Sequence, residues 1–166
     1  FHRLQGLGIT IEANMTDTAG RNHVHDAIHH SQACTQNRNN TQLLAGQHLL
    51  PPFGYRVSPT SGASTYHQGV DLDTGTGWSV VAARAGTAYT GYSGTAGNYV
   101  TIDHHDGFKS IYMHLNGFAS GINGRNVSAG ELIGYTGSTG VSTGDHLHFG
   151  ISLNGVYVNP CNYVPL

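Results

Sequence analysis

The fold class is decided by residues 99–114, which read Tyr-Val-Thr-Ile-Asp-His-His-Asp-Gly-Phe-Lys-Ser-Ile-Tyr-Met-His. β-Branched and aromatic residues flank Asp106-Gly107, a dipeptide that tolerates the positive φ values of a tight hairpin turn. Asn154-Gly155 lies in the same way between two short β-forming runs, 151–153 and 156–158. The sequence therefore predicts two antiparallel hairpins.

The same pattern extends from Gly69 towards the C-terminus, where short β-branched runs alternate with glycine-containing turns. The expected strands are residues 70–72, 79–82, 86–92, 99–104, 108–114, 131–136, 146–153 and 156–158. Strands at such close spacing are typical of a sandwich or a curled antiparallel sheet. We therefore predict a mainly β fold whose sheet forms the floor of a groove, with glycine-rich loops as its walls.

Residues 1–50 do not follow this pattern. They contain a polar run, 35–41, and little strand patterning, whereas residues 24–34 carry apolar side chains at helical spacing. Pro51-Pro52 then marks a break. We expect an N-terminal extension, 1–50, with a short helical segment, followed by a β domain, 51–166.

The composition excludes two classes of partner. Only 10% of the 166 residues are charged, Lys and Arg number seven, and the formal net charge is -2, so no basic stripe exists to neutralise nucleic acid. No apolar run is long enough to cross a bilayer, and the first residues lack the order of a signal peptide. We expect a soluble monomer that is a processed form or an excised domain.

Two cysteines, Cys34 and Cys161, belong to no Cys-x-x-Cys pattern. Low charge with abundant Gly and Tyr indicates an extracellular setting, in which a disulfide bond would persist. We predict that the two residues pair and tie the N-terminal extension to the C-terminus. Two buried free thiols are the alternative.

A first metal-binding pattern is His67-Gln-Gly-Val-Asp71, in which a loop histidine precedes an aspartate on an expected strand. Because side chains alternate along a strand, Asp71 shares a face with Gly69, whose missing side chain would leave room for an ion. Imidazole and carboxylate are ordinary zinc ligands.

A second pattern is His146-Leu-His148, which places two imidazoles on one strand face and Leu147 and Phe149 on the opposite, core face. One imidazole can bind a metal while the other moves a proton. Three protein ligands with an open fourth position are typical of a catalytic zinc site. His-x-His pairs also occur on solvated strands, so this pattern alone does not identify a site.

Four motifs together resemble the lysostaphin/LytM-type zinc endopeptidases of cell-wall peptidoglycan. They are Tyr66-His-Gln-Gly-Val-Asp-Leu72, Ile111-Tyr-Met-His-Leu115, Ile133-Gly-Tyr-Thr-Gly-Ser-Thr-Gly140 and His146-Leu-His-Phe149. The resemblance covers roughly residues 53–166 and would make residues 51–166 the zinc endopeptidase domain. It implies that His67, Asp71 and His148 bind one zinc ion.

The resemblance also implies the catalytic roles. His146 would be the general base for a zinc-bound water that attacks the scissile carbonyl, and His114 would help to hold that water and stabilise the oxyanion. A tyrosine shortly before the first ligand belongs to the pattern, with Tyr55 as the better match and Tyr66 as the alternative. Asp145 would either orient His146 or, as we prefer, form a turn.

The other histidines are expected to have no catalytic role. His104 and His105 adjoin a hairpin turn and are expected to be solvated. His25 and His29 share one face of the expected helix, where a surface position is favoured over a second metal site.

The resemblance implies hydrolysis of cross-links or stem peptides of bacterial peptidoglycan, outside the cell, in the cell wall or periplasm, or in a phage wall-degrading part. Family members cut Gly-Gly bonds or bonds next to D-Ala, and the sequence does not choose between them. The alternative is a silent or autoinhibited peptidoglycan-binding module of the same fold, since the resemblance does not extend to residues 1–50 and in some family members a preceding segment covers the cleft. Degenerate members lose ligands, whereas all three ligands and both catalytic histidines are kept here. A structural or carbohydrate-binding β-sandwich with incidental histidines is a third alternative and predicts no metal.

Overall fold

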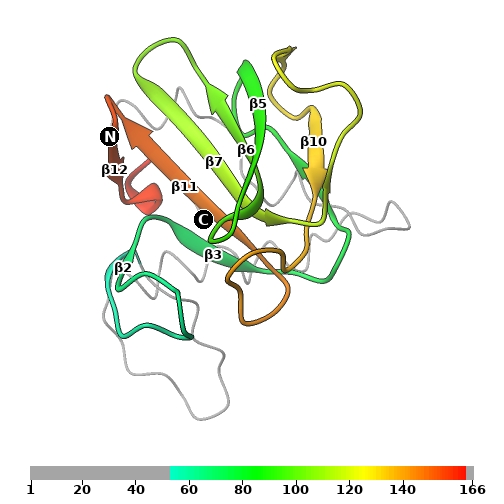
Figure 1. The fold of residues 1–166 in the computed structure, drawn as a ribbon. Coiled ribbons are helices and arrows are strands. Elements are labelled where there is room, and N and C mark those ends of the chain that lie inside the picture. Colours follow the sequence, from blue (N-terminus) through cyan, green and yellow to red (C-terminus); the bar gives the residue numbers. More distant parts are fainter. Residues whose placement is uncertain (1–52, 164–166) are drawn as a thin grey trace.

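Residues 53–163 are described by the structure, a computed structural model of the chain (Figure 1). Their main element is a seven-stranded antiparallel sheet in the order β12-β11-β7-β6-β5-β9, with β3 paired to β11 beyond the end of β12. Its strands are β3 (Val70–Asp73), β5 (Gly86–Ser93), β6 (Gly97–Asp103), β7 (Phe108–Leu115), β9 (Asn126–Val127), β11 (His146–Leu153) and β12 (Val156–Val158).

Two smaller sheets complete the fold. A three-stranded sheet has the order β4-β10-β8, and a two-stranded ladder pairs β1 with β2. These strands are β1 (Gly54–Tyr55), β2 (Tyr66–His67), β4 (Ser79–Val81), β8 (Gly117–Phe118) and β10 (Leu132–Tyr135). A short 3-10 turn, η2 (Pro160–Asn162), follows β12. The prediction of a mainly β, antiparallel fold is therefore confirmed. The helix expected over residues 24–34 lies outside the described residues.

The core is formed by apolar side chains from both of the larger sheets and from the connection between β8 and β9. The fully buried ones of largest volume are Tyr112, Phe149, Leu72, Ile102, Leu115, Ile122, Ile133, Leu147 and Ile151. Burial of each such side chain contributes about 1.5–3 kcal/mol, before the loss of conformational entropy is counted. Leu147 and Phe149 lie on the core face of β11, as the alternation predicts.

Both predicted hairpins are present, but their turns differ. Asn154 and Gly155 have φ values of 50° and 82° and join β11 to β12 directly. Between β6 and β7 the positive φ values fall on His105 (62°) and Gly107 (91°), not on Asp106. The turn is longer than predicted, and within it the Asp106 carboxylate accepts a hydrogen bond from the backbone N–H of Phe108. Within residues 53–163, no helix is long and apolar enough to span a membrane.

Candidate metal and catalytic site

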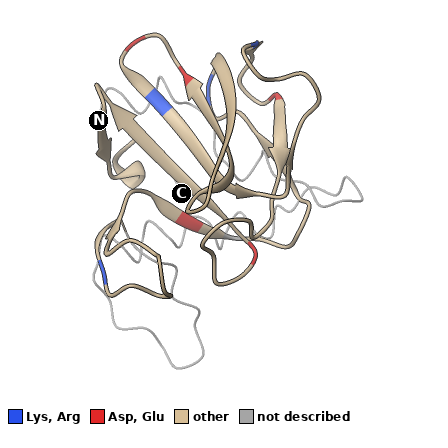
Figure 2. Ribbon diagram, in the orientation of Figure 1, with Lys and Arg blue, Asp and Glu red and all other residues tan. Residues whose placement is uncertain are grey.

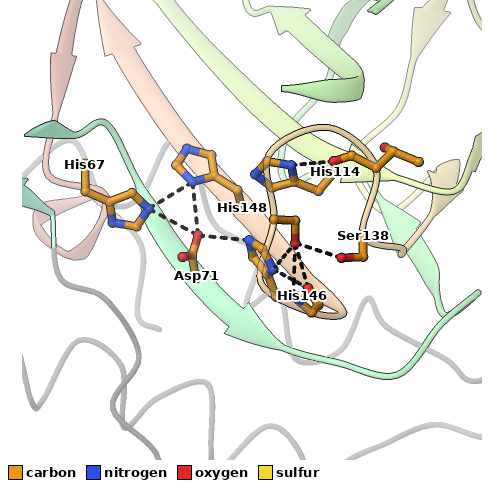
Figure 3. A network of polar contacts seen from close by, with 9 residues as sticks. His67, Asp71, His114, Ser138, His146 and His148 are labelled. Atoms are coloured by element: carbon orange, nitrogen blue, oxygen red, sulfur yellow. Dashed lines mark hydrogen bonds and ion pairs between the residues drawn. The ribbon is translucent and has the colours of Figure 1, made fainter. Parts of the chain in front are cut away.

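Three side chains from three strands form a compact group of possible metal ligands (Figure 3). His67 ends β2, Asp71 lies on β3, and His148 lies on β11 directly opposite Asp71 in the antiparallel register. Asp71 Oδ1 lies 3.1 Å from His67 Nε2 and 3.0 Å from His148 Nδ1, and the two nitrogens are 3.0 Å apart. All three residues are buried. We call them the metal-ligand cluster.

Gly69 allows the two strands of this cluster to approach closely. A Cβ atom on Gly69 would lie 2.3 Å from the carbonyl oxygen of Phe149 and 2.7 Å from Nε2 of His148. The space beside Gly69 therefore accommodates β11 itself and the back of the His148 ring, rather than an ion as the sequence suggests. Glycine is needed at this position because any side chain would displace the β11 backbone or the His148 ring.

His146 lies at the start of β11 with its two ring nitrogens in different surroundings. Nδ1 lies 2.8 Å from the carbonyl oxygen of Gly144, to which it donates, and 3.2 Å from Oγ of Ser142. Nε2 lies 3.6 Å from Oδ1 of Asp71 and faces the metal-ligand cluster. The Gly144 carbonyl thus fixes the tautomer that leaves Nε2 able to accept a proton.

Asp145 does not orient His146. Its carboxylate accepts a hydrogen bond of 2.6 Å from the hydroxyl of Thr76. The turn interpretation of Asp145 therefore agrees with its contacts.

His114 reaches the site because β7 carries a bulge near its end. Asn98 pairs with Leu115 and Val100 with Tyr112, so that Met113 and His114 stand together opposite Tyr99. His114 has a φ of 63°, an uncommon value for a non-glycine residue that often marks functional positions. Its Nδ1 donates to the carbonyl oxygen of Thr139 at 2.8 Å, and its ring centroid lies 4.8 Å from that of His146. Simple alternation along the strand does not predict this orientation.

Burial and mutual contacts shift the pKa values of this group. Burial favours the neutral form of Asp71, but hydrogen bonds and charges from His148 and His67 outweigh it and hold the pKa of Asp71 well below its ordinary value. Burial lowers the pKa of His148, and it lowers the pKa of His114 to about 4. A carboxylate beside neutral imidazoles is the protonation state that metal binding requires.

A cavity of about 310 Å³ opens beside these residues. Its floor includes Met113 and His114 from β7, and its walls come from the β1–β2 loop and from the loop before β11. His67, Asp71, His146 and His148 also line it. The structure thus brings together the five predicted ligands and catalytic histidines at one groove.

The two candidate tyrosines occupy different positions. Tyr66 lines the cavity, whereas Tyr55 is 86% exposed and is not among the lining residues. Their rings are in contact, edge to face, with centroids 4.8 Å apart. Tyr55 remains the sequence-based prediction for a hydroxyl near the reacting carbonyl, and Tyr66 has the more direct access.

His104 is buried, and the prediction that it is solvated is wrong. Its Nδ1 donates to the carbonyl oxygen of Ala85 at 2.8 Å, and its Nε2 lies 3.0 Å from Oγ of Ser110. Ser110 also bonds to the buried hydroxyl of Tyr112, which accepts from the backbone N–H of Ala83. We call His104, Ser110 and Tyr112 the His104 network. One feature of the sequence could have indicated this network. Ser110 lies two residues before Tyr112, so both side chains are on the same face of the strand, where they can contact His104.

The remaining predictions for His and Cys concern less central positions. His105 is exposed as predicted, and its Nε2 lies 2.8 Å from the hydroxyl of Thr87. His25 and His29 lie outside the described residues. Cys161 is buried in η2. Its predicted partner, Cys34, lies outside the described residues, so the pairing of the two cysteines stays a prediction.

The donor set of the metal-ligand cluster fits zinc. Two imidazole nitrogens and one carboxylate oxygen are ordinary zinc ligands, and three protein ligands leave a fourth position for water or substrate. The three candidate atoms lie within 4.8 Å of one another. His146 and His114 are close enough to act on a group held at that fourth position.

Several known proteins that are similar to most of the described chain are peptidases. The chain is 39% identical over 122 residues to the DD-carboxypeptidase/endopeptidase Mpg of Neisseria meningitidis, an alignment that covers 73% of this chain and 28% of that protein. The catalytic domain of lysostaphin from Staphylococcus simulans is similar in structure, with a TM-score of 0.61 and 32% identity over 68% of this chain and 88% of that one. A zinc-containing peptidase from Vibrio cholerae gives a TM-score of 0.59 with 29% identity, over 72% of this chain and 38% of that one.

The chain spans little more than a quarter of the curated relative's length. The profile of peptidase family M23 matches residues 65–160, which include both metal-binding patterns, the His114 motif and the strands that carry them. The resemblance seen in the four sequence motifs is confirmed. The chain belongs to peptidase family M23.

Proposed function

We propose that the chain is a zinc metalloendopeptidase that hydrolyses peptide bonds of bacterial peptidoglycan, in the extracellular space, the cell wall or the periplasm. The observation that carries the proposal is the convergence of His67, Asp71 and His148 with the proton-accepting nitrogen of His146 at one groove. The names of the relatives support the substrate class.

His67, Asp71 and His148 would hold the zinc ion through Nε2, Oδ1 and Nδ1. When bound, zinc would lower the pKa of a water molecule to about 7 and polarise the scissile carbonyl. The low pKa of Asp71 keeps its carboxylate ionised, and burial keeps His148 neutral, so that both are ready to bind. A ligand set already held by hydrogen bonds loses little conformational freedom on binding.

His146 would accept the proton of the attacking water at Nε2, because Nδ1 already donates to Gly144. The protonated ring could then pass the proton to the leaving amine. His114 would accept a hydrogen bond from the attacking water at Nε2 and help to orient it, since its Nδ1 donates to Thr139. A tyrosine hydroxyl would be the donor that stabilises the charge on the carbonyl oxygen.

The groove suits a small, flexible peptide. Beside the histidines, its walls contain small or hydroxyl-bearing residues such as Ala63, Ala96 and Ser142. A peptide rich in glycine or alanine would fit these walls without a clash. This supports peptidoglycan peptides as the substrate over ordinary protein segments, which carry bulkier side chains.

The proposal is tested by wall lysis and by digestion of defined muropeptides, with the products identified by mass. We expect the zinc-loaded chain to release new amino termini from peptidoglycan, and His146→Ala to bind zinc without doing so. A chain that binds zinc and peptidoglycan but cuts neither would support the silent module instead. A chain that binds no zinc would contradict the proposal.

A further inference from the structure

Arg56 lies on the wall of the groove, immediately after β1. Within residues 53–163 it is the only Lys or Arg among the residues that line this cavity. Its backbone N–H donates to the carbonyl oxygen of Thr65 at 2.8 Å, and its Nε donates to that of Ser64 at 3.2 Å. The first bond fixes the backbone, and the second holds Nε of the guanidinium group. The two Nη nitrogens make no hydrogen bond to any described residue.

Charge pairing sets Arg56 apart from the other arginines of the described chain. Arg84 pairs with Asp106 at 2.7 Å, and Arg125 lies 3.5 Å from Glu131. Arg56 has no carboxylate partner among the described residues, and the Lys and Arg positions are few and lie apart along the ribbon (Figure 2). Its charge is therefore available to a molecule that enters the groove.

Away from the metal-ligand cluster, no other Lys or Arg among the described residues lines the groove and would compete for an anion. Asp71 is its one described acidic residue, and both neighbouring imidazoles already contact the Asp71 carboxylate. The other walls are hydroxyl-bearing or apolar side chains such as Thr60, Pro59 and Val141. An acidic peptide would thus find one cationic side chain in the groove, separate from the metal-ligand cluster.

We propose that Arg56 binds a free carboxylate of the peptide substrate and selects acidic stem peptides over neutral glycine bridges. The inference rests on the proposed function and deepens it by naming the substrate class. A guanidinium fork matches the geometry of a carboxylate and can form two parallel hydrogen bonds with it. Stem peptides carry free carboxylates on side chains or at the chain end, whereas a glycine bridge joined by amides at both ends carries none.

The test uses synthetic stem peptides that contain the same scissile bond and differ only in one carboxylate. One peptide keeps every carboxylate, a second has the side-chain carboxylate converted to the amide, and a third has the C-terminal carboxylate converted to the amide. We expect the zinc-loaded protein to cut the first peptide on the order of tenfold to a hundredfold faster in kcat/KM than one of the two amides. Whichever amide is slow identifies the carboxylate that Arg56 binds.

Three variants assign this preference to Arg56. Arg56→Gln should remove it by slowing cleavage of the acidic peptide and leaving the slow amide unchanged. Arg56→Lys should keep part of it, because the charge stays while the fork is lost. Arg125→Gln, a matched loss of an arginine outside the groove, should keep the full preference.

Equal rates for all three peptides with the unmodified protein, or a full preference in Arg56→Gln, would overturn the inference while the proposed function stands. Cleavage of a glycine bridge as fast as the acidic peptide would also overturn it. Failure to cut any peptide would instead overturn the proposed function, and the role of Arg56 with it.

Discussion

The structure has two buried polar groups that both include residues from strand β7. One is the metal-ligand cluster with its two neighbouring histidines, and the other is the His104 network. The histidines of the two groups use their ring nitrogens differently. Both nitrogens of His104 are taken by the protein, one by Ala85 and one by Ser110. His114 and His146 each give one nitrogen to a backbone carbonyl and direct the other towards a common groove. Burial lowers the pKa of both His104 and His114.

The difference separates structural from chemical histidines. A buried histidine whose hydrogen bonds are closed within the protein fixes the elements that it joins, here the segment after β4 and the start of β7. A histidine held by one nitrogen has a fixed ring plane and tautomer, yet keeps a proton acceptor or metal ligand for an incoming group. Burial and a low pKa do not distinguish the two. The direction of the second nitrogen does.

Removal of the proton acceptor should have the largest effect. We expect His146→Ala to lower kcat by about 10²–10⁴-fold, the usual contribution of general acid–base catalysis, while the zinc content is retained. The measurement is cleavage of a defined muropeptide together with metal analysis of the same sample. His105→Asn is the matched control, since this exposed residue has a positive φ that asparagine tolerates. Similar losses in both variants would show that the loss in His146→Ala does not come from a specific role as proton acceptor.

Crowding the back of His148 should disturb the metal-ligand cluster without changing a ligand. We expect Gly69→Ala to lower the free energy of unfolding by about 1–3 kcal/mol and to weaken zinc binding, because the new Cβ meets Phe149 and the His148 ring. Gly117→Ala is the control, as a Cβ there has no atom within 4 Å and its φ is not positive. Chemical unfolding and a zinc titration measure the two effects. Unchanged zinc affinity in Gly69→Ala would show that the ring has room to move.

The His104 network should respond to pH through stability. The pKa of His104 is lowered by burial, so the unfolded chain binds a proton near its ordinary pKa of 6.5 while the folded chain does not. The contribution of neutral His104 to the free energy of unfolding is therefore fully present above pH 6.5. It declines as the pH falls from 6.5 towards the lowered pKa of the folded state. We expect His104→Gln to cost about 1–3 kcal/mol at pH 7.5, because Ser110 and Ala85 lose a partner.

The same variant should show a smaller decline in stability between pH 7.5 and 5.5 than the unmodified protein. Urea unfolding at the two pH values measures this, and kcat at pH 7.5 should change little. A large loss of kcat in a folded His104→Gln protein would mean that the network also serves catalysis.

The tyrosine pair should give the smallest effect. We expect Tyr55→Phe to lower kcat by about tenfold, less than the loss of a fully buried oxyanion donor, because its side chain is 86% exposed. Tyr66→Phe is the matched variant on the neighbouring ring. A larger loss in Tyr66→Phe, measured with the same muropeptide, would transfer the role to Tyr66.

Much of the site follows from local sequence pattern. The alternation in His146–Leu153 predicts the bounds of β11 and the shared face of its two histidines, because period-two patterning needs only neighbouring residues. The Asn154-Gly155 turn is predicted for the same reason, as its backbone demands are local. The three residues predicted as ligands lie together, with their candidate ligand atoms within 4.8 Å of one another, and their binding of a metal stays a prediction.

Other features depend on contacts between distant segments. The bulge that turns His114 into the groove arises from the pairing of β7 with β6, and strict alternation would have placed Met113 and His114 on opposite faces. His104 is buried because the segment around Ala85 covers it, which its neighbours in sequence do not reveal. The two-residue strands β1 and β2 are too short to produce a pattern.

The metal content of three proteins tests the central claim most directly. The unmodified chain, His148→Ala and His104→Ala would be purified with zinc, dialysed and analysed for zinc per chain. We predict one zinc ion in the unmodified chain and in His104→Ala, and none in His148→Ala. Absence of zinc from the unmodified chain, or equal retention in His148→Ala, would contradict the assignment of His67, Asp71 and His148 as the ligands.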